Sequence, residues 1–143
     1  MDLKLEAQST IFLSIKPQFV SLISTGKKNH EFRKYIPHNL VKHIIVYTCC
    51  PVGEIRYILT IENIIKYPDK IDEQGVGNKD FNEGKKKSIY AYRIKNVYQL
   101  DEGISLSFLK NHFLFSPPQR FLYGTSQEDL LCHIGSLPKR RIQ

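Results

Sequence analysis

Two long stretches of β-forming residues limit the folds open to this chain more than any other feature. Residues 54–67 alternate and then become continuously apolar, and residues 88–100 alternate around Arg93 and Lys95. Branched and aromatic residues of this kind predict long strands. No repeating strand–helix unit and no glycine-rich phosphate loop accompanies them, which argues against a doubly wound parallel sheet. We therefore expect an α+β, mainly β domain: a small, mostly antiparallel β-barrel or curved sheet with short helices flanking a cleft.

Shorter elements are predicted around these strands. Residues 11–16 and 43–50 are dense in apolar residues and predict strands. Pro17 has a fixed φ that suits a first helical turn, and Gly26 can adopt the left-handed conformation that ends a helix. The remaining predicted elements are a strand over 29–35, a bend near Glu62, a turn capped by Asn78 and ending at Phe81, a helix over 105–112, and a helix capped by Thr125 or Ser126 and ended by Gly135.

The segment that follows the first predicted helix brings three ionisable groups together. Lys28, Glu31 and Arg33 have no apolar period of their own. In an extended chain Glu31, Arg33 and Tyr35 share one face. Lys28 and Arg33 would hold a phosphate, and Glu31 would accept a hydrogen bond from the exocyclic amine of a base. The competing interpretation is structural: the three groups tie the helix end to the sheet through salt bridges.

Other residues are candidates for the wall of the same cleft. Lys16 would add positive charge at the end of the first strand, and Tyr35 would stack on a base. Arg93 lies on the late strand, and Gln119 follows the rigid Pro117–Pro118 pair. Solvation of Lys16, a core role for the tyrosine and a structural strap at Gln119 are the competing interpretations. The five histidines lack the paired spacing of a helical metal site, so we predict no metal and no cofactor.

Charge and composition restrict the partners and the compartment. The net charge of +7 favours an anionic partner, with nucleic acid ahead of a membrane surface. No apolar run approaches the length of a membrane span, and three cysteines argue against a secreted disulfide framework. We expect a cytoplasmic protein, or a nuclear one. The expected organisation is an extension over residues 1–10, one domain over 11–135 and a mobile basic tail over 136–143.

The residues from Gly26 to Arg33 resemble the signature of the ASCH domains of the PUA-like superfamily. That signature is glycine, any residue, lysine, two residues, glutamate, any residue, arginine, and it is met here by Gly26, Lys28, Glu31 and Arg33. The resemblance extends over about residues 11–123, because Ser14–Pro17, Tyr47–Pro51 and Ala91–Ile94 follow in the order of the family. It implies a PUA-like β-barrel with a cleft beside the signature, in a superfamily associated with RNA and modified bases.

The same resemblance raises the question of catalysis. Small bacterial members of the superfamily include amidohydrolases that remove the acyl group of N-acetylated cytidine. This chain is similar to them at Gly26, Lys28 and Arg33, but Glu31 stands where they carry a threonine. The hydroxyl nucleophile is therefore missing at the matching position, and the activity does not transfer. A second acidic residue on a later strand would also be needed, and Glu62 is a candidate by order alone.

Three hypotheses about function remain. The leading one is a small nucleic-acid-binding module, with RNA favoured over DNA, or a nucleotide or modified base as the ligand. Its contacts would come from Lys16, Lys28, Glu31 and Arg33. The first alternative is a nucleoside amidohydrolase with Lys28 as the base and Glu31 as its orienting group. The second alternative is an adaptor that binds a protein partner and no nucleic acid, as the occurrence of the family in regulatory assemblies suggests.

Overall fold

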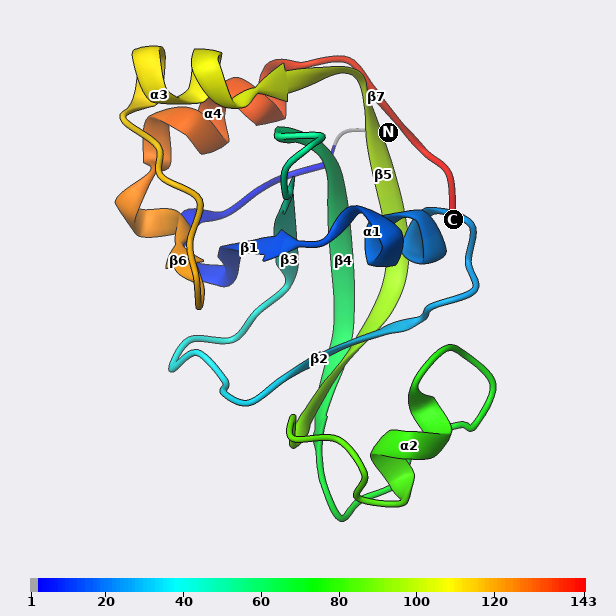
Figure 1. The fold of residues 1–143 in the computed structure, drawn as a ribbon. Helices are drawn as coiled ribbons and strands as arrows, with labels where there is room; N and C mark the ends of the chain where they lie inside the picture. Colours follow the sequence, from blue (N-terminus) through cyan, green and yellow to red (C-terminus); the bar gives the residue numbers. More distant parts are fainter. Residues whose placement is uncertain (1–2) are drawn as a thin grey trace.

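A computed structural model describes residues 3–143, which form one curled sheet with short helices along its faces and ends (Figure 1). The strands are β1 (Thr10–Ile15), β2 (His30–Arg33), β3 (His43–Thr48), β4 (Glu54–Lys66), β5 (Tyr90–Ser105), β6 (Leu122–Tyr123) and β7 (Lys139–Arg141). The α-helices are α1 (Pro17–Ser24), α2 (Asn78–Asn82), α3 (Leu106–Phe113) and α4 (Glu128–Ser136), and short 3-10 turns cover Ala7–Ser9 and Gly124–Ser126. Within residues 3–143, no helix has the length and apolar character needed to cross a bilayer.

The two long strands pair with each other and form the centre of the sheet. The strand order is β2-β5-β4-β3-β1-β6, and β7 pairs with another part of β5. The expected mainly β fold is confirmed, and the predicted bend in β4 is a change of register between Thr60 and Asn63. One pair differs from the antiparallel rule, because β1 and β3 run parallel. The chain passes through α1 and β2 between them, which gives the long crossover that a parallel pair needs.

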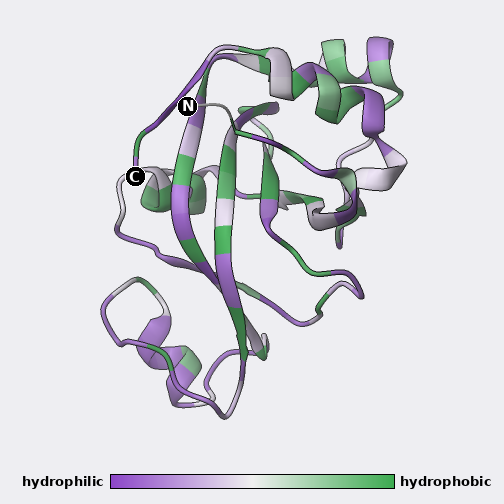
Figure 2. Ribbon diagram, turned by 180° about the vertical axis from the view of Figure 1, so that it is seen from behind, coloured by the Kyte–Doolittle hydropathy of each residue, from purple (hydrophilic) through white to green (hydrophobic). Residues whose placement is uncertain are grey.

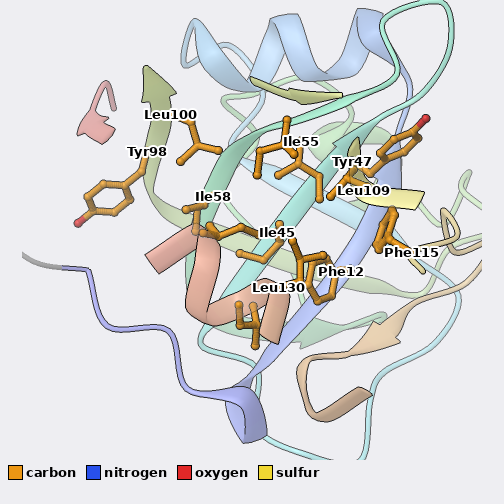
Figure 3. Packing of buried hydrophobic residues seen from close by; sticks show 13 residues of the cluster. Phe12, Ile45, Tyr47, Ile55, Ile58, Tyr98, Leu100, Leu109, Phe115 and Leu130 are labelled. Carbon is orange, nitrogen blue, oxygen red and sulfur yellow. The ribbon is translucent and has the colours of Figure 1, made fainter. Parts of the chain in front are cut away.

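Alternation along β1 divides the core between the two faces of the sheet. Phe12 points to a cluster that includes Leu109 of α3 and Leu130 of α4 (Figure 3). Its neighbours Ile11 and Leu13 belong to a second cluster on the other face, under α1. Because successive side chains of a strand point to opposite faces, one apolar strand supports helices on both sides. The α1 helix is thereby fixed against the sheet next to β2.

The polar segment between β4 and β5 has a small core of its own. It is largely hydrophilic (Figure 2), but Ile71 and Phe81 pack against Ala91 of β5. The prediction that Asn78 caps α2 is wrong, since Gly77 occupies the cap position. Asn78 is buried, and its Nδ2 donates to Asn29 Oδ1 at 2.9 Å and to two backbone carbonyls. Asn78 therefore anchors this segment to the chain just before β2.

The last helix also begins and ends differently from the prediction. Neither Thr125 nor Ser126 caps α4, because both lie in the 3-10 turn that precedes it. Gly135 does not end the helix, which continues to Ser136. Its backbone is helical, so this glycine is simply one more residue of the last turn.

The predicted mobile tail is a strand. Residues 139–141 form β7, which pairs with β5 from Tyr98↔Arg141 to Leu100↔Lys139. Beyond β7, Gln143 Nε2 donates to the Ser24 carbonyl at 3.0 Å, next to the end of α1. Figure 1 shows the carboxyl terminus beside that helix. The basic side chains of this segment suggested that it is solvated. The edge of β5 that β2 leaves open can nevertheless form backbone hydrogen bonds with it, and the charge of the side chains does not prevent this pairing.

Candidate functional site

The end of α1 sets the direction of the chain that carries the charged groups. Thr25 is the cap residue, and Gly26 follows with a φ of +80°, as the sequence predicts. The amide of Lys28 then donates to the Leu22 carbonyl at 3.0 Å, which folds this residue back against the helix. The left-handed conformation at Gly26 is open to glycine at little cost. Lys28 is thus held between α1 and the start of β2.

Lys28, Glu31 and Arg33 form one buried ionic network. Lys28 Nζ lies 3.2 Å from Glu31 Oε1, and Arg33 contacts Glu31 Oε2 through Nη2 at 2.7 Å and through Nε at 2.9 Å. The three side chains are only 6%, 8% and 16% exposed in the order Lys28, Glu31, Arg33. Arg33 Nη2 also donates to the Ser14 carbonyl of β1 at 3.0 Å. The network therefore joins β2 to β1.

The network still has hydrogen-bonding capacity to spare. Lys28 Nζ donates to Glu31 and to the His30 carbonyl, so one of its three protons is unused. Glu31 Oε1 accepts only from Lys28, which leaves that oxygen an unused acceptor position. Burial lowers the pKa of Lys28, while the Glu31 carboxylate opposes this shift and favours the charged form. A donor and an acceptor therefore stand side by side.

These two groups open into a hollow of about 220 Å³, which we call the Lys28 hollow. Two ammonium groups lie near the Phe32 ring, with Lys28 Nζ and Lys86 Nζ each 4.6 Å from its centroid. Phe19 of α1 stands at the side and is 40% exposed. The complete lining is Phe19, Lys28, Glu31, Phe32, Val76, Gly77, Lys86 and Ser88. Because β2 is an edge strand, groups from both of its faces reach this hollow.

Gly77 controls the space between Lys86 and Phe32. Its φ is +85°, and a Cβ atom there would lie 2.9 Å from Phe32 Cε2 and 3.0 Å from Lys86 Cε. We expect Gly77→Ala to lower the free energy of unfolding by about 1–2 kcal/mol. The alanine would have a strained φ, and its Cβ would displace the side chains of Phe32 and Lys86. Urea denaturation measures this loss. The control is Gly135→Ala in α4, where a Cβ meets no atom within 4 Å, and equal losses in the two variants would contradict the prediction.

His30 makes stability depend on pH. The side chain is fully buried, and Nδ1 lies 2.7 Å from Asn29 Oδ1. Burial, with the positive charges of Arg93 and Lys28, lowers its pKa to about 4. His30 of the unfolded chain therefore takes up a proton near pH 6.5, whereas His30 of the folded chain does so only near pH 4. The contribution of His30 to the free energy of unfolding is complete above pH 6.5 and falls as the pH drops toward 4.

We expect the free energy of unfolding to fall by about 2 kcal/mol between pH 7.5 and pH 5 through His30. Urea denaturation at the two pH values measures the difference, and His30→Gln should remove most of it. A parent protein equally stable at both values, or a variant with an unchanged dependence, would show that His30 is not the titrating group.

Of the other residues predicted for the site, Tyr35 contacts the network and Arg93 lies on another face of the sheet. Tyr35 joins the network, since Arg33 Nη1 lies 3.4 Å from its hydroxyl. Lys16 and Gln119 are exposed, and Lys16 precedes α1 as its cap residue. Arg93 does not belong to the group: it is paired with His30 across β2 and β5, whereas Glu31 is paired with Tyr92. Residues opposite each other in a sheet share a face, so Arg93 and Glu31 lie on different faces.

The second acidic candidate also lies elsewhere. Glu62 Oε2 is 2.6 Å from Arg93 Nε, and its side chain is 48% exposed. It lines a separate hollow with the loop from Ile36 to Val41. Glu62 has no partner in the register of β4 and β5, because the register changes between Ile61 and Asn63. Among residues 3–143, no group of three or more His, Cys, Asp or Glu side chains is arranged to hold a metal ion.

Among the residues that line the hollow, Lys28 and Glu31 were identified from the sequence, and the others, including Lys86 and Phe19, were missed. Lys86 belongs to a lysine triplet over residues 85–87, a pattern typical of a solvated loop, yet it packs on Phe32. Phe19 fitted the apolar face of the helix but is partly exposed at the hollow. The only available signal was the lysine triplet itself. Its position over β2 depends on the packing of Phe81 and Ile71, which lies outside any local pattern.

The chain matches a known domain family in sequence and solved structures in fold. The family model described as ASCH domain matches residues 13–101. The crystal structure of ASCH from Zymomonas mobilis superposes with a TM-score of 0.68 at 23% identity, covering 92% of this chain and 97% of that one. A tyrosine-to-phenylalanine variant of the same protein gives a TM-score of 0.68 at 21% identity, covering 91% and 99% of the two chains. No curated protein matches in sequence. The solved structures share the fold, and the family match includes the whole signature segment: this chain belongs to the ASCH domain family.

Proposed function

We propose that the protein binds single-stranded RNA, or a nucleotide, with one base in the Lys28 hollow. The observation that carries this proposal is the combination of two aromatic rings, the exposed Phe19 and the half-buried Phe32, with the Lys28–Glu31 donor and acceptor pair in a single small hollow. Its family, a PUA-like module of RNA-binding type, supports the same class of partner. The base would pack on the rings and meet the ionic pair with its polar edge.

The size and charge of the hollow favour an unpaired base. A volume of about 220 Å³ lies below the usual range for drug-sized ligands and suits one ring system. Bases in an RNA duplex do not offer their edges to such a recess, whereas splayed bases do. Lys86 at the rim would meet the adjoining phosphate, in keeping with the net charge of +7. Arg33 would act mainly by holding Glu31, because four of its five N–H donors have partners within the protein.

Titration of a fluorescent single-stranded RNA at several salt concentrations tests the proposal. We expect Phe19→Ala to weaken binding about fivefold, as the loss of a partly exposed stacking surface should. Lys86→Ala should also weaken binding. It should reduce the magnitude of the slope of log affinity against log salt concentration by about 0.7, which is the contribution of one phosphate on a single strand. Phe108→Ala and Lys110→Ala, at the opposite end of the molecule, serve as matched controls. Binding that changes equally in all four variants would exclude the hollow.

One observation favours a second candidate, the nucleoside amidohydrolase. Lys28 is buried with a lowered pKa beside a carboxylate, and the Ser88 hydroxyl lines the same hollow. A lysine that loses its proton in such a place is a possible general base. Incubation with N-acetylated cytidine and separation of free cytidine tests this candidate, with Lys28→Met as the control. Release of cytidine no faster than in the control would exclude it.

A further inference from the structure

A line of contacts continues from the Lys28 hollow to an aromatic group beyond the end of β2. Arg33 binds Glu31 on one side, and on the other its Nη1 approaches the Tyr35 hydroxyl at 3.4 Å. The Tyr35 hydroxyl donates to the Arg120 carbonyl at 2.6 Å. The Tyr92 hydroxyl donates to the Tyr35 carbonyl, also at 2.6 Å. Tyr35 is therefore fixed through both its backbone and its side chain.

The Arg120 side chain lies over this fixed ring. Its Cζ is 4.6 Å from the centroid of Tyr35 and 5.6 Å from that of Phe121. The two rings are 5.5 Å apart, and Tyr123 meets Phe121 edge-on at 5.0 Å. Arg120 is exposed, and within residues 3–143 its guanidinium has no carboxylate partner. An exposed guanidinium supported by an aromatic ring is a surface on which a base can stack.

The aromatic surface at Arg120 lies next to the Lys28 hollow, on the other side of Arg33. Arg33 separates Tyr35 from the hollow, because it contacts Glu31 through Nε and Nη2 and approaches the Tyr35 hydroxyl through Nη1. Between them lies the junction of β1 and α1, where Arg33 binds the Ser14 carbonyl and Lys16 is exposed to solvent. Figure 1 shows β2 passing alongside α1 toward the side where β6 lies. A strand of nucleic acid following β2 would meet Lys16 on the way.

We propose that Arg120, supported by Tyr35 and Phe121, forms a second base subsite for the same single-stranded RNA. This inference rests on the proposed function of the Lys28 hollow. One base occupies the hollow, the connecting phosphates pass Lys16, and a later base stacks on the Arg120 guanidinium. Tyr35, which we predicted to stack on a base directly, supports Arg120 instead, because the guanidinium covers its ring.

Calorimetric titration with a cytidine mononucleotide and with a cytidine tetranucleotide tests this subsite. We expect Arg120→Ala to weaken tetranucleotide binding about tenfold and to leave mononucleotide binding within about twofold of the parent. Arg120→Lys keeps the charge but loses the planar group, so it should resemble Arg120→Ala. Phe19→Ala should weaken both ligands, and Lys110→Ala, the charge-matched control on α3, should weaken neither.

The outcomes separate the two proposals. If the mononucleotide binds the parent and the tetranucleotide binds no tighter, the second subsite is overturned while the hollow stands. Tetranucleotide binding that survives Arg120→Ala, or that is restored by Arg120→Lys, also overturns stacking at this place. Absence of binding by both ligands overturns the function of the hollow and the second subsite with it.

Discussion

Replacing Glu31 with alanine should lower the free energy of unfolding by about 3–5 kcal/mol. The carboxylate is the anion between Lys28 and Arg33 in the buried network, and each of its oxygens contacts one of these cations. Its removal would leave two cations with little access to water, a state that burial makes costly. Urea denaturation at neutral pH measures the loss.

Glu83→Ala is the matched control for this prediction. Glu83 also pairs with a lysine, at 2.9 Å from Lys85, but the two side chains are 36% and 66% exposed. Exposed pairs contribute little, so the control should lose far less stability than Glu31→Ala. If Glu31→Ala does not fold, Glu31→Gln preserves the volume and should show a smaller loss of the same sign. A loss at Glu31 no greater than at Glu83 would mean that the network does not stabilise the fold.

Replacing Lys28 with methionine should weaken binding and leave the fold intact, in contrast to Glu31→Ala. We expect a folded protein that binds RNA at least tenfold more weakly. Without Lys28 the network keeps one anion and one cation, with two Arg33 nitrogens in contact with Glu31 Oε2. Burial already disfavours the lysine charge, and an apolar side chain of similar length fills the same space. We expect the stability to change by no more than about 1 kcal/mol, while the unused donor of the hollow is lost.

Stability and binding must be measured on the same preparation of this variant. The free energy of unfolding comes from urea denaturation and the affinity from titration with single-stranded RNA. Lys79→Met, on the exposed side of α2, removes the same charge without touching the hollow. RNA affinity that falls equally in both variants would assign the effect to net charge alone. If Lys28→Met unfolds while Glu31→Ala stays stable, the claim that Glu31 stabilises the network and Lys28 does not would be wrong.

Local patterns were sufficient for most of the fold. The two long strands, the helix between Pro17 and Gly26 and the shared face of Glu31, Arg33 and Tyr35 follow from alternation and from the conformations open to proline and glycine. These features depend on neighbours in the sequence. The network of Lys28, Glu31 and Arg33 could be predicted for the same reason, because all three groups lie within one turn and one short strand.

Contacts between distant segments could not be predicted in this way. β7 is stabilised by the open edge of β5, which no pattern in residues 139–141 reveals. Lys86 reaches Phe32 only because Phe81 and Asn78 fix the intervening segment against β5 and Asn29. The face of Arg93 follows from its pairing with His30, and register depends on the partner strand. The wall of the hollow is therefore a property of the tertiary structure.

Photo-crosslinking of a thiouridine-labelled single-stranded RNA, with the attached peptides identified by mass spectrometry, tests the central claim most directly. The claim is that a base lies between Phe19 and Phe32, above the Lys28–Glu31 pair. We predict that the adducts fall on the peptides carrying Phe19 and Phe32 and decrease in Lys28→Met. Adducts confined to the exposed Arg140 and Arg141 of β7, with none at the hollow, would contradict the claim.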